Sequence, residues 1–194
     1  MNILEMNLSK RRLKMKLKLK KITLSKEEDF EDTADSLSNY DSPKPDQSPK
    51  SGKFNQTKVY KINPNLFMSG YHSAADLKTL KQNQITHVIN LTSQYCQNLH
   101  ESFVSYSNFQ LSDNSNFDLT PFLEEITKTI YQKIEQGQKV LVHCKMGVSR
   151  APSVIIAFLI KQLRMDFYSA FNHVHQINSK ISPNLGYLMQ LQKL

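Results

Sequence analysis

The stretch that most constrains the fold of this chain lies between residues 139 and 163. Residues 139–143 form a short apolar run typical of a strand, and residues 150–163 form a strongly apolar segment of helical length. Only six residues, 144–149, connect the two, and Gly147 lies among them. A strand that enters a helix through so tight a loop predicts an α/β arrangement.

Strands and helices alternate through the rest of the C-terminal region. We predict strands at residues 59–62, 66–68, 85–91, 103–111 and 139–143, the first two joined by an Asn-Pro-Asn turn. Helices are predicted at residues 74–81, 120–136 and 150–163, then from the cap residue Asp166 to about residue 177, and finally from Ser182-Pro183 onward. The alternation predicts a single α/β domain with a mainly parallel, twisted sheet of about five strands flanked by helices.

The N-terminal region has a different composition. Residues 26–53 are rich in Ser, Asp, Lys and Pro and contain few large apolar side chains. Such a segment cannot bury enough surface to offset the entropy lost on ordering. We therefore expect a disordered arm and linker over residues 1–56 and a folded domain over residues 57–194.

The net charge of +8, from 25 basic and 17 acidic residues, comes from one segment. Residues 10–21 hold eight basic residues and no acidic one, and the remainder of the chain carries 17 of each sign. A near-neutral body with one basic arm is not a uniformly basic nucleic-acid binder, so we expect no nucleic-acid partner.

Several other classes are excluded by simple counts. No run of about 18 apolar residues is present, so we expect no membrane span, and the N-terminus lacks the continuous apolar region of a secretion signal. Two cysteines, Cys96 and Cys144, are too few for a disulfide framework or a four-cysteine zinc site. The histidines form no metal-ligand grouping. We expect a reduced, cytoplasmic or nuclear setting, with no metal and no cofactor.

The loop between the central strand and helix carries the residues best suited to chemistry, His143-Cys144-Lys145-Met146-Gly147-Val148-Ser149-Arg150. At a helix N-terminus the backbone N–H groups of residues 145–150 converge on one point and form an anion site, and Gly147 lets the backbone turn. Arg150 can bind two phosphate oxygens with its planar guanidinium. Cys144 lies at the focus of the same dipoles, which stabilise a thiolate placed for in-line attack on phosphorus.

This octapeptide matches the pattern His-Cys-x-x-Gly-x-x-Arg, and on it the chain resembles the dual-specificity family of cysteine-based protein phosphatases. Residues 66–92, 152–161 and 165–190 are also similar to that family, and the loop is close to its slingshot subgroup. The resemblance implies the family fold over residues 57–194. It also implies hydrolysis of phosphotyrosine and phosphoserine or phosphothreonine in proteins through a phosphocysteine on Cys144.

A phosphatase of this kind needs a general acid to protonate the leaving oxygen. In the family that the chain resembles, a loop aspartate upstream of the cysteine has this role. Asp113 lies 31 residues before Cys144, directly after a predicted strand, and we expect it to be the acid. Asp118, 26 residues before Cys144, is the alternative, although its position also suits the start of the helix at residues 120–136.

Supporting roles also follow from the resemblance. His143 matches a histidine that helps to set the thiolate, with packing at a strand end as the alternative. Asn184 matches a residue that supports the phosphate loop, and polarity at a helix start explains it equally well. The family usually places Ser or Thr directly after the arginine, where the hydroxyl helps the thiolate to leave. Ala151 stands there in this chain, so we expect slow breakdown of the phosphocysteine, with Ser149 or Ser153 as partial substitutes.

Two other functions stay open from the sequence, a phosphoinositide phosphatase and a phosphoprotein-binding module with little turnover. The basic arm offers a partner site, because Lys10-Arg11-Arg12 precedes alternating apolar residues within residues 10–19. This pattern resembles the basic and hydrophobic motifs that bind mitogen-activated protein kinases. The alternatives for the arm are a solvated electrostatic tail and a patch for nuclear import or for anionic membranes.

Overall fold

The computed structural model describes residues 58–194, so the basic arm and the linker predicted at residues 1–56 lie outside the described part. The described elements follow one another as β1 (Val59–Asn63), β2 (Leu66–Gly70), α2 (Tyr71–Ala74), α3 (Leu77–Gln82), β3 (His87–Asn90), β4 (Ser105–Asn108), α4 (Thr120–Glu135), β5 (Val140–Cys144), α5 (Arg150–Leu163), α6 (Phe167–Ile177) and α7 (Leu185–Leu191). No helix of residues 58–194 combines the length and the apolar character needed to cross a bilayer.

The five strands form one sheet in the order β1-β2-β5-β3-β4. The β1–β2 pair is antiparallel, and the three pairs that join β2, β5, β3 and β4 are parallel. The predicted single α/β domain with a mainly parallel five-stranded sheet is therefore confirmed. Gly70 pairs with Cys144 and Asn90 pairs with His143, so the carboxyl ends of three strands meet at one edge of the sheet.

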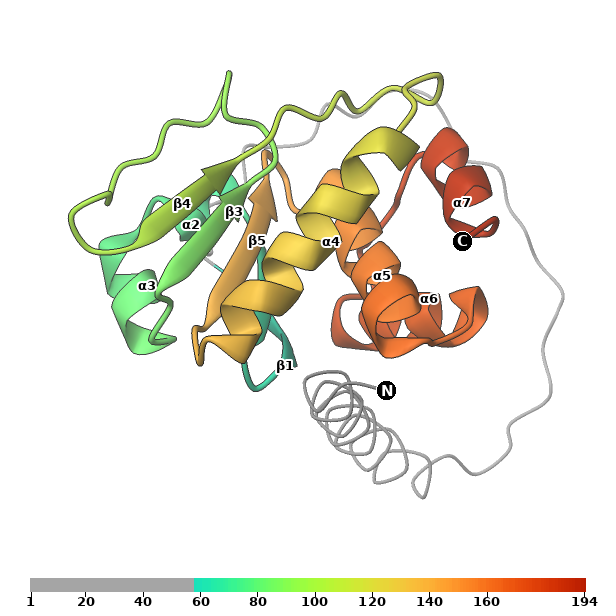
Figure 1. The fold of residues 1–194 in the computed structure, drawn as a ribbon. Coiled ribbons are helices and arrows are strands. Elements are labelled where there is room, and N and C mark those ends of the chain that lie inside the picture. Colours follow the sequence, from blue (N-terminus) through green and yellow to red (C-terminus); the bar gives the residue numbers. More distant parts are fainter. Residues whose placement is uncertain (1–57) are drawn as a thin grey trace, which may run out of the picture.

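Helices cover both faces of the sheet, as Figure 1 shows, with α4 to α7 on one side and α2 and α3 on the other. The central strand β5 contributes to both layers because neighbouring side chains on a strand point to opposite faces. Val140 and Val142 belong to the core under α4 and α5, and Leu141 belongs to the core under α3. All five residues of β5 are buried, so the strand that ends in Cys144 is fixed on both faces.

The boundaries of several elements differ from the sequence prediction for identifiable reasons. The helix predicted at residues 74–81 begins later, as α3 at Leu77, because the Asp76 side chain accepts hydrogen bonds from the backbone N–H groups of Lys78 and Thr79 and caps it; Ala74 is the last residue of the separate short helix α2. The strands predicted at residues 85–91 and 103–111 are shorter, at four residues each. The prediction for α5, residues 150–163, is confirmed at both ends.

Candidate active site

The loop between β5 and α5 curls around the sulfur of Cys144. The backbone N–H of Gly147 donates a hydrogen bond to Sγ at 3.2 Å, and Cys144 is only 1% exposed. Gly147 has a φ of +75°, and a Cβ on it would lie 2.6 Å from the backbone nitrogen of Gly70. The turn that directs this N–H to the sulfur therefore needs glycine, both for its backbone conformation and for its close approach to β2.

Backbone contacts on two sides fix the loop. The N–H of Tyr71 donates to the carbonyl of Lys145 at 3.1 Å, and the N–H of Ser182 donates to the carbonyl of Val148 at 2.7 Å. Lys145 and Met146 expose their side chains, whereas Gly147 and Ser149 are buried and Val148 is half-buried. Because these carbonyls are bonded away from the sulfur, the loop can present its N–H groups inward to an anion.

Arg150 lies in the first turn of α5 and turns toward the segment that carries Asp113. Its Nη1 donates to the carbonyl of Leu111 at 3.3 Å, and its Nε lies 3.5 Å from Oδ2 of Asp113. This Nε is buried and makes no hydrogen bond within residues 58–194. A buried guanidinium N–H that has an ion pair with Asp113 but no hydrogen bond, beside a loop suited to an anion, can donate to a phosphate oxygen.

The carboxylate of Asp113 receives two hydrogen bonds on one oxygen. Ser149 Oγ donates to Oδ1 at 2.6 Å, and Nδ2 of Asn184 donates to the same Oδ1 at 3.0 Å. Asn184 also donates its backbone N–H to Ser149 Oγ at 3.3 Å. The four residues Asp113, Ser149, Arg150 and Asn184 therefore form one connected cluster, built from three separate segments of the chain.

Asp118, the alternative acid, has a different role in the structure. Its Oδ1 accepts the backbone N–H of Thr120 at 3.0 Å, at the first residue of α4. The structure brings Asp113, and not Asp118, into contact with Ser149 and Arg150.

His143 is buried beside the nucleophile candidate, and its environment sets its charge. Burial lowers the pKa of its imidazole to about 4, and a contact with the backbone of Cys144 offsets this only in part. The ring is therefore neutral at physiological pH and supplies no positive charge to a thiolate. The donor that the structure places against Sγ is instead the uncharged backbone N–H of Gly147, at 3.2 Å.

Ser149 and Ser153, whose hydroxyls could replace the one that Ala151 lacks, donate to other acceptors. Ser149 Oγ donates to Asp113, and Ser153 Oγ donates to the carbonyl of Ser149 at 2.8 Å. A serine hydroxyl has one proton, so neither proton is available to the sulfur in this conformation. Ala151 itself is fully buried.

Two polar residues of α7 near this cluster were not singled out from the sequence for any role, Tyr187 and Gln190. The Tyr187 hydroxyl donates to the carbonyl of Ser112, and Gln190 bonds the backbone of Phe117 and Leu119. A signal was available, since Asn184, Tyr187 and Gln190 are three residues apart and so lie on one face of a helix.

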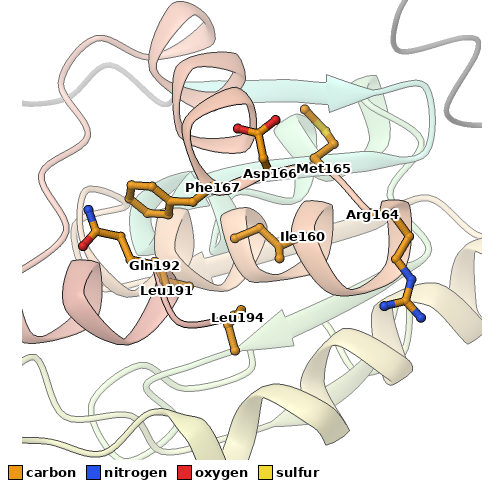
Figure 2. A pocket seen from close by; sticks show the side chains of 8 residues that line it. All are labelled: Ile160, Arg164, Met165, Asp166, Phe167, Leu191, Gln192 and Leu194. Carbon is orange, nitrogen blue, oxygen red and sulfur yellow. The ribbon is translucent and has the colours of Figure 1, made fainter.

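A separate hollow of about 280 Å³ lies between the end of α5, the start of α6 and the end of α7. Figure 2 shows its lining, which includes Arg164, Asp166 and Phe167 and contains none of the predicted site residues. Within residues 58–194 no group of three or more His, Cys, Asp or Glu side chains is placed to bind a metal ion.

Comparison with known proteins gives the family. Residues 66–194 match the family described as dual specificity phosphatase, catalytic domain. The chain is 34% identical over 137 residues to mouse (Mus musculus) protein phosphatase Slingshot homolog 3. The matched region covers 71% of this chain and 21% of that protein. It is 34% identical over 132 residues to dual specificity protein phosphatase 1B of Arabidopsis thaliana, covering 68% of this chain and 78% of that protein. The chain thus spans about a fifth of the length of the Slingshot relatives that it matches.

Solved structures agree with the sequence match. The human tyrosine phosphatase-like serine/threonine/tyrosine-interacting protein superposes with a TM-score of 0.66 at 28% identity, covering 71% of this chain and 95% of that one. Human DUSP28 superposes with a TM-score of 0.65 at 25% identity, covering 70% of this chain and 90% of that one. With the loop around Cys144 and the parallel sheet beneath it, these matches show that the chain belongs to the dual-specificity phosphatase family of the cysteine-based protein tyrosine phosphatase superfamily.

Proposed function

We propose that residues 58–194 hydrolyse phosphate monoesters on tyrosine and on serine or threonine of proteins, through a phosphocysteine on Cys144. The observation that carries the proposal is the hydrogen bond of 3.2 Å from the Gly147 N–H to Sγ, at the N-terminus of the 14-residue helix α5. N–H dipoles that converge on a sulfur favour the thiolate and also bind the phosphate that it attacks.

In the first step, the Sγ thiolate forms an S–P bond as the ester P–O bond breaks. The N–H groups of residues 145–150 and the guanidinium of Arg150 bind the three non-bridging oxygens. The Nε of Arg150 supports this role, since it is buried and, beyond its ion pair with Asp113 Oδ2 at 3.5 Å, makes no hydrogen bond within residues 58–194. The charge that develops on the phosphoryl oxygens then meets donors that are already in position.

The leaving oxygen takes its proton from Asp113. Because Oδ1 accepts hydrogen bonds from Ser149 and Asn184, the acid proton resides on Oδ2. Oδ2 is also the oxygen that lies 3.5 Å from Arg150 Nε, so it faces the same space as the bound phosphate would. Ser149 and Asn184 thereby orient the carboxyl group for proton transfer.

In the second step, a water oxygen forms a bond to phosphorus as the S–P bond breaks. The Asp113 carboxylate accepts a proton from that water, inorganic phosphate leaves and the thiolate is restored. Ala151 provides no hydroxyl to donate to the departing sulfur, so this second step is the slow one. The phosphocysteine accumulates during turnover as a result.

The test compares wild type with Cys144→Ser on p-nitrophenyl phosphate and on matched phosphotyrosine and phosphothreonine peptides. Wild type releases phosphate from all three substrates, and Cys144→Ser releases none at a measurable rate. Release from phosphotyrosine alone contradicts dual specificity, and release from neither peptide contradicts a protein phosphatase.

A phosphoprotein-binding module with little turnover is the second candidate, and Ala151 is the observation that favours it. In that case the phosphopeptides bind with equal affinity to wild type and Cys144→Ser, at most one equivalent of dephosphorylated peptide forms per protein, and no inorganic phosphate is released. A phosphoinositide phosphatase is separated in the same experiment by a soluble inositol phospholipid as a third class of substrate.

The partner of the basic arm is a further proposal. We expect residues 10–19 to dock a mitogen-activated protein kinase, in a cytoplasmic or nuclear setting. The alternating spacing of the apolar residues in this segment suits an extended peptide in a groove. Removal of residues 1–25 should abolish kinase binding and leave p-nitrophenyl phosphate hydrolysis unchanged; equal binding by both forms contradicts the docking role.

A further inference from the structure

One face of α7 contacts the loop that carries Asp113 along most of the length of that loop. Residues 112–119 lead from the β4 side of the sheet into α4, and Figure 1 shows this segment passing beside α7. Tyr187 and Gln190, three residues apart, share the face of α7 that begins at its cap residue Asn184.

The contacts from α7 hold the backbone of the loop at both ends. At its start, the Tyr187 hydroxyl donates to the carbonyl of Ser112, the residue before Asp113. At its end, the Gln190 amide makes two bonds: Nε2 donates to the carbonyl of Phe117 at 3.0 Å, and Oε1 accepts the N–H of Leu119 at 2.7 Å. Both side chains of α7 thus bind main-chain groups on either side of Asp113.

Close packing completes this contact. A Cβ on Gly186 would lie 1.7 Å from the carbonyl oxygen of Ser115, so the helix backbone rests directly on the middle of the loop. Tyr187 is fully buried, and burial, followed by the charge of Asp113, raises the pKa of its phenol. The phenol therefore keeps its proton at neutral pH and remains a hydrogen-bond donor to Ser112.

We infer that α7 holds the acid-bearing loop in its working position before substrate binds, with Tyr187 and Gln190 as positioning residues for Asp113. The inference rests on the proposed function, since it requires Asp113 to donate a proton. A small displacement of an acid from its substrate costs much of its catalytic effect, because proton transfer needs hydrogen-bond distance. Tyr187 and Gln190 act only through the loop and touch no reacting atom.

The test uses two aryl phosphates that differ in their need for an acid. Phenyl phosphate has a poor leaving group that must be protonated, whereas 2,4-dinitrophenyl phosphate loses its phenolate without a proton. Tyr187→Phe and Gln190→Ala should each lower kcat/KM for phenyl phosphate about 10-fold and for 2,4-dinitrophenyl phosphate less than about twofold. Asp113→Asn should also lower kcat/KM mainly for phenyl phosphate, and by a larger factor than either α7 variant.

Matched controls remove the same groups elsewhere. Tyr168→Phe deletes a hydroxyl from a side chain that is 70% exposed on α6, and Gln192→Ala deletes an exposed amide just after Gln190. Both controls should keep the wild-type rates on both substrates. In an Asp113→Asn background, Tyr187→Phe should cost nothing further, because the group that it positions is already absent.

An equal loss on both substrates, or no loss, in Tyr187→Phe and Gln190→Ala contradicts the inference. A further loss of Tyr187→Phe in the Asp113→Asn background contradicts it as well. If thermal denaturation shows that Tyr187→Phe is not folded, the rates of Gln190→Ala alone decide whether α7 positions Asp113. If Asp113→Asn lowers kcat/KM equally for phenyl phosphate and 2,4-dinitrophenyl phosphate, the acid role in the proposed function fails. That result is distinct from a failure of the positioning role of α7.

Discussion

Ser149 donates a hydrogen bond of 2.6 Å from its hydroxyl to Oδ1 of Asp113, and so joins the loop between β5 and α5 directly to the loop that carries Asp113. The two residues are 36 apart in sequence and lie on opposite sides of α4 and β5 along the chain. Since Asn184 donates to the same oxygen, Oδ2 is left to face Arg150. Ser149 thus holds the carboxyl group of Asp113 beside the loop that begins at Cys144.

Substitution of Asp113 and of Asp118 should affect activity differently, because we expect only Asp113 to act as the general acid. Asp113→Asn should reduce kcat/KM on a phosphothreonine peptide by roughly 10²-fold or more, because the serine or threonine alkoxide leaves only when protonated. Asp118→Asn is the matched control, and it should keep nearly the wild-type rate because the Asp118 carboxylate accepts the N–H of Thr120 at the start of α4. Steady-state phosphate release measures both. A larger loss in Asp118→Asn than in Asp113→Asn would move the acid role to Asp118.

The phosphate loop should be sensitive to a single methyl group at Gly147. Gly147 and Gly137 have nearly the same positive φ, +75° and +77°, but a Cβ at Gly137 meets nothing within 4 Å. Gly137→Ala should therefore cost about 1 kcal/mol of unfolding free energy, from backbone strain alone, with normal activity. Gly147→Ala adds the clash with Gly70, so it should destabilise by more and abolish activity. Urea denaturation and initial rates compare the pair, and equal effects would contradict the close packing of the loop on β2.

The alanine after Arg150 should make turnover biphasic. With excess p-nitrophenyl phosphate, rapid-quench measurement should show a burst of nitrophenol close to one equivalent per site, followed by a slower steady rate. Ala151→Ser restores a hydroxyl at that position and should raise the steady rate and reduce the burst. Because Ala151 is fully buried, thermal denaturation must accompany the kinetics. A linear time course in wild type, without a burst, would show that breakdown of the intermediate is not the slow step.

Stability should fall on mild acidification. Burial lowers the pKa of His87 and of His143 from 6.5 to about 4. Between these values the unfolded chain binds more protons than the folded chain, so the unfolding free energy falls as pH falls from about 6.5 toward 4. Each histidine contributes roughly 1 kcal/mol per pH unit in this window. Urea denaturation at pH 7.0 and at pH 5.0 measures the difference, and His87→Gln should remove about half of it. Equal stability at the two pH values would contradict the neutral, buried state of these rings.

Much of the site could be predicted from sequence because its central part is local. Cys144, Gly147 and Arg150 lie on one strand-loop-helix unit, whose apolar pattern and short loop determine where the side chains point. Asp113 was predicted through a resemblance in spacing, and the structure brings it to Ser149. The contact of Tyr187 with Ser112 joins residues 75 apart in sequence, and no local pattern encodes such a distance.

The errors in the predicted boundaries of helices and strands also come from contacts that a local pattern does not encode. The sequence predicts a helix over residues 74–81, but the carboxylate of Asp76 accepts hydrogen bonds from two backbone N–H groups, so helix α3 begins only at Leu77. The strand at residues 103–111 alternates over nine residues in sequence, but only Ser105–Asn108 has a parallel neighbour in β3. Strand length depends on the partner as well as on the pattern.

The most direct test of the account is to trap phosphate on the nucleophile. The protein is mixed with a ³²P-labelled phosphopeptide, quenched in acid within the first turnover, digested and analysed by mass spectrometry. The label should appear on the peptide that contains Cys144, at close to one equivalent in wild type and also in Cys96→Ser, and it should be absent in Cys144→Ser. Phosphate release without any label on Cys144, or label that persists in Cys144→Ser, would contradict covalent catalysis by this cysteine.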